Sequence, residues 1–143
     1  MKKGILKQIK APTVISRFKR KTALAKCYFS SEKINNSIIL INNRDYTISN
    51  EKIKFSLDLF LKSFPQVTKL EKSIKIYTSG GGVSSQQEII IKSLAKFCLL
   101  NNILSKVELL NYNYCILSSD GRYVYSKVPE GPGARAKRQK SYR

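Results

Sequence analysis

The sequence predicts an α+β fold, a two-layer sandwich in which two helices cover one face of a mostly antiparallel four-stranded sheet, with extended basic arms at both ends. Three observations predict it: short β-branched runs bounded by turn residues, two segments with apolar residues at helical spacing, and a hydrophobic content of 42% in 143 residues, which suits one compact core. The expected order is about three strands, a helix, a strand and a helix. Helices that cover one face of such a sheet make an α+β sandwich.

Strands are expected in the apolar or alternating runs, at 22–29, 37–41, 45–48, 73–78 and, as a last strand or a helix end, 113–118. In the fourth run Ile74 and Ile76 alternate with Lys75 and Tyr77, so one face of the strand is apolar. The NNR run at 42–44 predicts a turn, because Asn adopts positive φ angles almost as readily as Gly does.

Two helices are expected, over 50–64 and 86–104. The first carries apolar residues at helical spacing and ends at Pro65, and its expected core residues are Ile53, Leu57, Leu61 and Phe64, helped by Phe55 and Phe60. The expected core residues of the second are Ile90, Leu94, Phe97, Cys98 and Leu104. Cys98 is expected to fill the core because it falls on the apolar face of this helix.

Charge is the strongest compositional signal. Lys and Arg number 27 against 9 Asp and Glu, which gives a net charge of +18 and a pI near 10.0. Residues 1–26 hold nine basic and no acidic side chains, and residues 127–143 hold six basic and one acidic. This pattern predicts a basic arm at 1–16, a globular RNA-binding domain at 17–126 and an extended basic tail at 127–143. Such a balance is typical of proteins that bind a nucleic acid.

Several functional classes are not supported. The three cysteines lie far apart and histidine is absent, so no zinc site is expected and the thiols are expected to be reduced. The sequence offers no catalytic constellation, and we expect neither enzymatic activity nor a cofactor. The start MKKGILKQIK lacks the apolar stretch of a signal peptide, and no run is long enough to span a membrane.

The segment SGGGVSSQQE at 79–88 joins an expected strand to an expected helix. Ser85 and Glu88 have the spacing of a capping box at the helix start. The three glycines have three possible explanations: a tight turn without a ligand, a nucleotide-phosphate loop, or a contact to an RNA phosphate. The second is disfavoured because both the GK[ST] ending and the GxGxxG pattern are missing.

Four motifs resemble those of one family. KRKTALAKC at 19–27, INNR at 41–44, GGGVSSQ at 80–86, and the run from Asp120 that ends in GPGARAKRQKSYR resemble the universal small-subunit ribosomal protein nine, called protein sixteen in the eukaryotic cytosolic ribosome. The likeness spans about residues 17–143, and within the family the sequence resembles a divergent eukaryotic member. Departures from the family pattern are Ile91 in place of an arginine, Gly121 in place of a proline, Tyr125 in place of a glutamate, Phe18 in place of a glycine, and Asn43 in place of a glycine.

The resemblance implies a structural role in translation. It implies the fold of the second domain of small-subunit ribosomal protein five, with a left-handed βαβ crossover, and ribosomal RNA (rRNA) in the head of the small subunit as partner. Neighbouring small-subunit proteins and the tRNA in the peptidyl (P) site are further expected partners. Cytoplasmic ribosomes are the expected location, with no membrane partner and no homo-oligomer.

The resemblance and the charge pattern together imply the contact residues. For rRNA these are Arg17, Lys19, Arg20, Lys21, Gly80, Gly81, Gly82, Ser84, Gln86, Lys96, Arg122, Lys127, Arg135, Lys137, Arg138 and Lys140. For tRNA they are Tyr142 and Arg143.

The tail has a physical reason to act at a distance. Its seventeen residues at 127–143 span at most roughly 55 Å when extended, whereas the radius of gyration of the domain should be only ~13 Å. Arg143 can grip a phosphate with two parallel hydrogen bonds, and Tyr142 can stack on a base. Charge alone equally suits a free-standing RNA-binding regulator or RNA chaperone, which stays as the alternative. A membrane-surface binder is disfavoured because the cations do not line one face of an amphipathic helix.

Overall fold

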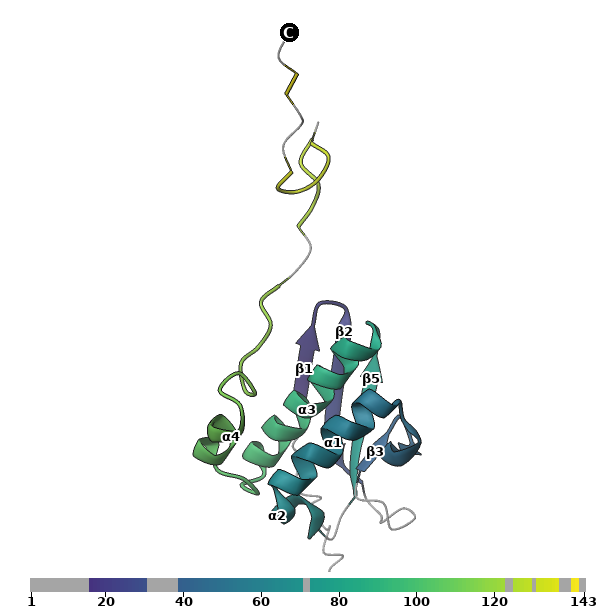
Figure 1. Ribbon diagram of the computed structural model, residues 1–143, viewed down its shortest axis with the longest axis vertical. Coiled ribbons are helices and arrows are strands. Elements are labelled where there is room, and N and C mark those ends of the chain that lie inside the picture. The colour runs from purple at the N-terminus through teal and green to yellow at the C-terminus, as the bar shows by residue number, and fades with distance from the viewer. Residues whose placement is uncertain are drawn as a thin grey trace, which may run out of the picture.

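The computed structural model describes residues 16–30, 39–70, 73–122, 125–129, 131–136 and 140–141. Helices cover one face of a twisted sheet, and the chain beyond the last helix runs past the end of the first strand and away from the body (Figure 1). The predicted N-terminal arm at 1–16 falls almost wholly outside the described residues, although Ser16 already belongs to the sheet.

The sheet has five strands in the order β1-β2-β5-β3-β4. Their bounds are Ser16–Arg20 for β1, Ala23–Phe29 for β2, Ile39–Ile41 for β3, Arg44–Asp45 for β4 and Ile74–Ser79 for β5. β1–β2, β2–β5 and β3–β4 are antiparallel, whereas β3 and β5 are parallel. The α+β two-layer expectation is confirmed, but the sheet is mixed and five-stranded, not four-stranded.

The parallel strands β3 and β5 are joined by a crossover connection that contains the helices α1 and α2. The chain leaves β3 through β4, passes through α1 and α2, and returns as β5 between β3 and β2. In Figure 1 the helices lie toward the viewer, β5 runs upward into the start of α3, and β3 lies to the right of β5. Because the connection crosses in front and returns to the left, the crossover is left-handed.

The NNR turn forms as expected. Asn42 and Asn43 adopt φ angles of 49° and 66°, which Asn tolerates better than other non-glycine residues. The Asn42 side chain also accepts a hydrogen bond from the Thr78 backbone N–H at 2.9 Å and donates one to the Thr78 hydroxyl at 3.1 Å. The turn between β3 and β4 is thereby tied to β5.

The helices are α1 Glu51–Ser63, α2 Pro65–Thr68, α3 Val83–Leu100 and α4 Lys106–Tyr112. Asn50 caps α1 by accepting from the Lys52 N–H at 3.1 Å. Phe64 follows α1, and Pro65 begins α2, since proline suits the first position of a helix.

The strand expectations at 45–48 and 113–118 are wrong, and one helix was not predicted. Residues 45–48 form the end of β4 and a short 3₁₀ helix, Tyr46–Ile48. Residues 113–118 follow α4 without forming a strand. α4 itself was not expected, although Ser105 and Glu108 form a complete capping box at its start.

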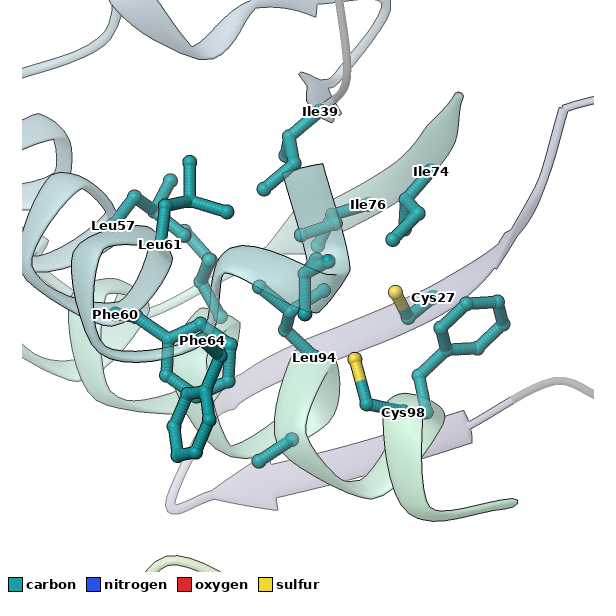
Figure 2. Close-up of a cluster of buried hydrophobic side chains, with 14 of the residues drawn as sticks. Cys27, Ile39, Leu57, Phe60, Leu61, Phe64, Ile74, Ile76, Leu94 and Cys98 are labelled. Atoms are coloured by element: carbon teal, nitrogen blue, oxygen red, sulfur yellow. The ribbon is translucent and has the colours of Figure 1, made fainter. Parts of the chain in front are cut away.

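The core lies between the inner face of the sheet and the helices α1 and α3. Figure 2 shows Phe60 and Leu57 of α1, Leu94 of α3 and Ile76 of β5 converging there, and all four are fully buried. Each such side chain stabilises the fold by ~1.5–3 kcal/mol through burial. The expected core residues of both helices are buried except Phe55, which is 71% exposed because it lies on the face of α1 away from the sheet.

The buried cysteines belong to this core. Cys27 and Cys98 lie near each other among the core side chains of Figure 2, and both thiols are free. Burial raises the pKa of Cys27 well above its ordinary value and that of Cys98 to about 12. Both are therefore neutral packing residues at physiological pH, as expected for Cys98.

No helix among the described residues has both the length and the apolar character needed to cross a bilayer.

Candidate nucleic-acid interface

The outer face of the sheet, turned away from the helices, gathers cations and tyrosines. Strand alternation places Arg17 and Lys19 of β1 on this face, because their neighbours Ser16 and Phe18 are buried beneath them. The outward-facing side chains of the neighbouring strands include Lys26 and Tyr28 of β2 and Lys75 and Tyr77 of β5.

The strand register sets these side chains side by side. Arg17 lies opposite Lys26, which lies opposite Tyr77, while Tyr28 lies opposite Lys75. Like charges directly opposite each other on a sheet are destabilising. The Arg17–Lys26 pair therefore favours an anion above this face.

Tyr28 and Tyr77 stack at the centre of the outer face. Their ring centroids lie 5.5 Å apart with an interplanar angle of 10°. The Tyr77 hydroxyl donates to Oδ1 of Asn43 at 2.6 Å. Burial raises the pKa of Tyr28 to about 12, with a further contribution from its hydrogen bond to Tyr77. That hydrogen bond is the main reason why the pKa of Tyr77 is lowered. Both rings are thus held in one orientation.

In the glycine loop, residues 80–82, the structure explains why two of the positions are glycine. Gly80 and Gly81 both have φ near 70°, a region that favours glycine. A Cβ on Gly80 would lie 2.5 Å from the carbonyl oxygen of Thr22, and one on Gly81 would lie 2.7 Å from Cβ of Ala23. The loop therefore packs directly against the turn between β1 and β2, which supports the tight-turn explanation.

The loop also leaves an exposed surface at the start of α3. Gly82 is the N-cap without a side-chain hydrogen bond, and Ser84 is exposed. Gln86 donates from Nε2 to the Gly80 carbonyl oxygen at 3.2 Å. The expected capping box of Ser85 and Glu88 is wrong, because the helix begins three residues earlier than expected, at Val83, and Glu88 pairs with Arg20 of β1 and with Lys92 one turn further along α3.

Those pairs form an ionic cluster of Arg20, Glu88, Lys92, Asp120 and Arg122. Arg20 makes a salt bridge to Glu88, and Lys92 lies 3.1 Å from the same carboxylate. The Asp120 carboxylate accepts from Nε and Nη2 of Arg122 at 2.9 and 3.0 Å. Arg20 and Arg122, both expected at rRNA, thus already have carboxylate partners within the chain. Arg20 keeps 23% of its side chain exposed, and Arg122 keeps 63%.

A pocket of about 430 Å³ opens beside this cluster. Ile91, the residue that stands where the resemblance expects an arginine, lines it and makes that part of the wall apolar. The remaining lining residues are Arg20, Ser84, Gln87, Glu88, Lys92, Tyr112, Asn113 and Ile116. Lys96 lies one turn further along α3 and is half-buried.

The described parts of the tail lie beyond the body (Figure 1). Lys127, Arg135 and Lys140 are exposed. The Arg135 guanidinium carbon lies 5.1 Å from the centroid of the Tyr125 ring, and the Gly131 N–H donates to the Val128 carbonyl oxygen at 3.1 Å. Four further expected contact residues lie outside the described residues: Lys137, Arg138, Tyr142 and Arg143.

The expected contact residues therefore divide into separate groups. Arg17 and Lys19 lie on the outer face, with Lys21 in the adjoining turn, while Arg20 points to the ionic cluster. Lys26, Lys75, Tyr28 and Tyr77 also lie on the outer face but were not among the residues predicted from the sequence. The alternation of polar and apolar residues along 23–29 and 74–79 was the signal that could have found them.

Comparisons with known proteins assign the family. A family model described as ribosomal protein S9/S16 matches residues 18–143. The chain is 30% identical over 140 residues to the small ribosomal subunit protein uS9 of Thermoplasma volcanium, covering 91% of this chain and 98% of that protein. It is 31% identical over 134 residues to the protein of the same name from Picrophilus torridus, covering 91% and 97%. This chain belongs to the ribosomal protein S9/S16 family.

Proposed function

We propose that this chain is a structural constituent of the small ribosomal subunit, that it binds rRNA in the subunit head, and that its tail reaches the tRNA in the P site. The single observation that carries the first part is the family match across residues 18–143. We propose no catalytic activity for it, because a ribosomal protein acts by assembling into the subunit and by contacting RNA. Other small-subunit proteins and cytoplasmic ribosomes complete the proposal as its neighbours and its location.

The distribution of charge supports rRNA as the partner. Arg17, Lys19 and Lys26 project from one sheet face, and the net charge of the chain is +18. Phosphates neutralise such side chains and release counterions, which supplies most of the affinity of a basic protein for a polyanion. The exposed start of α3 at Gly82 and Ser84 adds free backbone N–H groups that favour a phosphate.

The direction of the tail supports a distant second partner. Residues 125–129 and 131–136 extend away from the sheet and helices (Figure 1). The exposed side chains of Lys127, Arg135 and Lys140 can be neutralised by rRNA phosphates along the path. Arg143 follows Lys140 by three residues in the sequence, and its guanidinium can hold a tRNA phosphate with two parallel hydrogen bonds.

Sedimentation tests the first part. In cells that express a tagged chain, the protein is expected in the small-subunit fractions of a sucrose gradient, at one copy per subunit, and it stays there after a moderate salt wash. A free-standing RNA-binding regulator would instead sediment mainly in the light fractions and leave the subunits in the wash. That result would reject the ribosomal proposal and support the alternative.

Deletion of Arg143 alone tests the tail. Small subunits that carry the truncated chain are expected to assemble normally but to bind P-site tRNA about 10- to 150-fold more weakly, since a charge-assisted hydrogen bond contributes ~1.5–3 kcal/mol. Arg143→Lys is the matched control, because it keeps the charge but loses the paired hydrogen bonds, and an intermediate affinity is expected. Unchanged tRNA affinity in the truncated subunits would reject the tail contact while leaving the rRNA role intact.

A further inference from the structure

We propose that the outer face of the sheet holds an unpaired rRNA base against the Tyr28–Tyr77 stack, with the flanking phosphates on Arg17, Lys26 and Lys75. This inference rests on the proposed function and names a site for it. The site lies on the three neighbouring strands β1, β2 and β5.

The cations of this face lack carboxylate partners among the described residues. The ion pairs found among the described residues join Arg20, Glu88, Lys92, Asp120 and Arg122, which form the ionic cluster away from the outer face. Asp45 is the acidic residue that the register places in the same row, and Leu40 and Lys75 separate it from Tyr28. A surface with this charge selects a polyanion and disfavours an acid-poor peptide.

The tyrosine pair is a feature that binding to phosphates alone would not require. Two parallel rings, fixed by the Tyr77–Asn43 hydrogen bond, stand half-buried on the central strands. An exposed ring face on a sheet is a platform on which an unpaired base stacks. Because the rings are already oriented, little side-chain freedom is lost when the base binds.

The spacing of the groups fits one nucleotide with its two phosphates. Lys26 lies directly opposite Tyr77 and Lys75 directly opposite Tyr28, so the Cβ atoms of each tyrosine–lysine pair lie about 5 Å apart across the strands. Arg17 extends the row beyond Lys26. Stacking tolerates any base, and Oδ1 of Asn43 is already engaged by Tyr77. The site is therefore expected to have little base specificity.

The test measures binding of the full-length chain to a transcript of the rRNA head domain. Tyr77→Leu, Tyr28→Leu and the double variant remove the platform, while Tyr77→Phe keeps the ring. Tyr114→Leu is the matched control, because Tyr114 is 82% exposed and lies outside the outer face. We expect the Leu variants to bind about 5- to 150-fold more weakly. Tyr77→Phe keeps the ring but loses the hydrogen bond to Asn43, so it is expected to lose less affinity than Tyr77→Leu, and Tyr114→Leu is expected to bind like the wild type.

Salt dependence separates the cations from the rings. Lys26→Gln and Lys75→Gln are each expected to reduce the slope of log affinity against log salt by about 1, whereas the tyrosine variants leave this slope unchanged. Ultraviolet crosslinking of the wild type in small subunits needs no variant and is expected to join Tyr28 or Tyr77 to a nucleotide.

The outcomes distinguish this inference from the function on which it rests. If the wild type binds the transcript while the folded Leu variants bind equally well, the base site is wrong and the rRNA role stands. Crosslinks from Lys26 and Lys75 to a neighbouring protein, with no nucleotide on either tyrosine, would overturn the site in the same way. A wild type that fails to bind the transcript and is absent from small subunits would overturn both.

Discussion

The Asp120 carboxylate lies 3.6 Å from Nε of Arg20 and so joins the root of the tail to the first strand of the sheet. The Asp120 side chain is only 8% exposed. It also accepts hydrogen bonds from the backbone and the guanidinium of Arg122. Lys92 reaches the Ser118 carbonyl oxygen at 3.4 Å, and Ile116 is buried. The chain is therefore anchored to the body at Asp120, just before the tail begins.

Asp120→Asn is expected to loosen this root without unfolding the body. The variant loses the ionic attachment to Arg20 and Arg122, while the core residues are untouched. Trypsin should then cleave after Arg122 faster than in the wild type, and the melting temperature should change little. Glu51→Gln removes one negative charge from the start of α1, far from the tail, and is the control. Equal cleavage rates in all three proteins would contradict the anchoring role.

The titration of Asp120 offers a second view of the same anchor. The hydrogen bond from the Arg122 side chain is the main reason why the pKa of Asp120 is lowered to about 2. Because this value lies below the ordinary ~3.9 of an aspartate, the ionised carboxylate stabilises the folded form above that pH, and this stabilisation is lost as the pH falls toward 2. Carbon NMR of the carboxyl group should record a midpoint near pH 2. A midpoint near pH 4 would show that Arg122 does not lower the pKa of Asp120.

Gly81→Ala is expected to destabilise the fold by about 1–3 kcal/mol. The new methyl group would meet Cβ of Ala23 at 2.7 Å, and the φ of 70° would be strained for alanine. Gly82→Ala is the matched control, because its Cβ would have nothing within 4 Å; a smaller loss of roughly 0.5–1 kcal/mol is expected, since alanine is a poorer N-cap than glycine. Urea unfolding measures both. Equal stabilities of the two variants would contradict the close packing of the glycine loop.

The three cysteines are expected to react with a thiol reagent in two classes. Cys27 and Cys98 are buried with raised pKa values, whereas Cys115 is half-buried. A thiolate is the reacting species, so a disulfide reagent at pH 8 should modify Cys115 first and the other two only after denaturant is added. Rapid modification of two thiols in the native protein would contradict the packing in Figure 2.

The helices, the core and the NNR turn could be predicted from the sequence because their signals are local. Leu57, Leu94 and Phe97 recur at helical spacing and are all buried. Phe55 shares the apolar character of its neighbours but faces solvent, since helical phase and not hydrophobicity decides which side chain meets the sheet.

The remaining elements depend on partners that are distant in the sequence. No strand was predicted before residue 22, but β1 forms because Ser16 and Phe18 pack inward and the strand pairs with β2. The parallel pairing of β3 with β5 brings together segments more than thirty residues apart. Glu88 has the spacing of a capping box with Ser85, but its carboxylate forms salt bridges to Arg20 and Lys92 instead.

The candidate site was predictable to a similar extent. Charge identified Arg17, Lys19 and the cations of the tail, because clustered basic residues are visible without a fold. The tyrosine stack was not visible, because Tyr28 and Tyr77 become neighbours only when β2 pairs with β5. The same holds for Asp120, whose partner Arg20 lies one hundred residues earlier.

The most direct test of the account is a side-chain-resolution map of the small ribosomal subunit that contains this chain and a P-site tRNA. The account predicts that the outer face of the sheet lies on rRNA, and that the tail threads through rRNA until the Arg143 guanidinium lies within hydrogen-bonding distance of a tRNA phosphate. A tail folded back on α4, or an outer face and Arg143 both open to solvent, would contradict it.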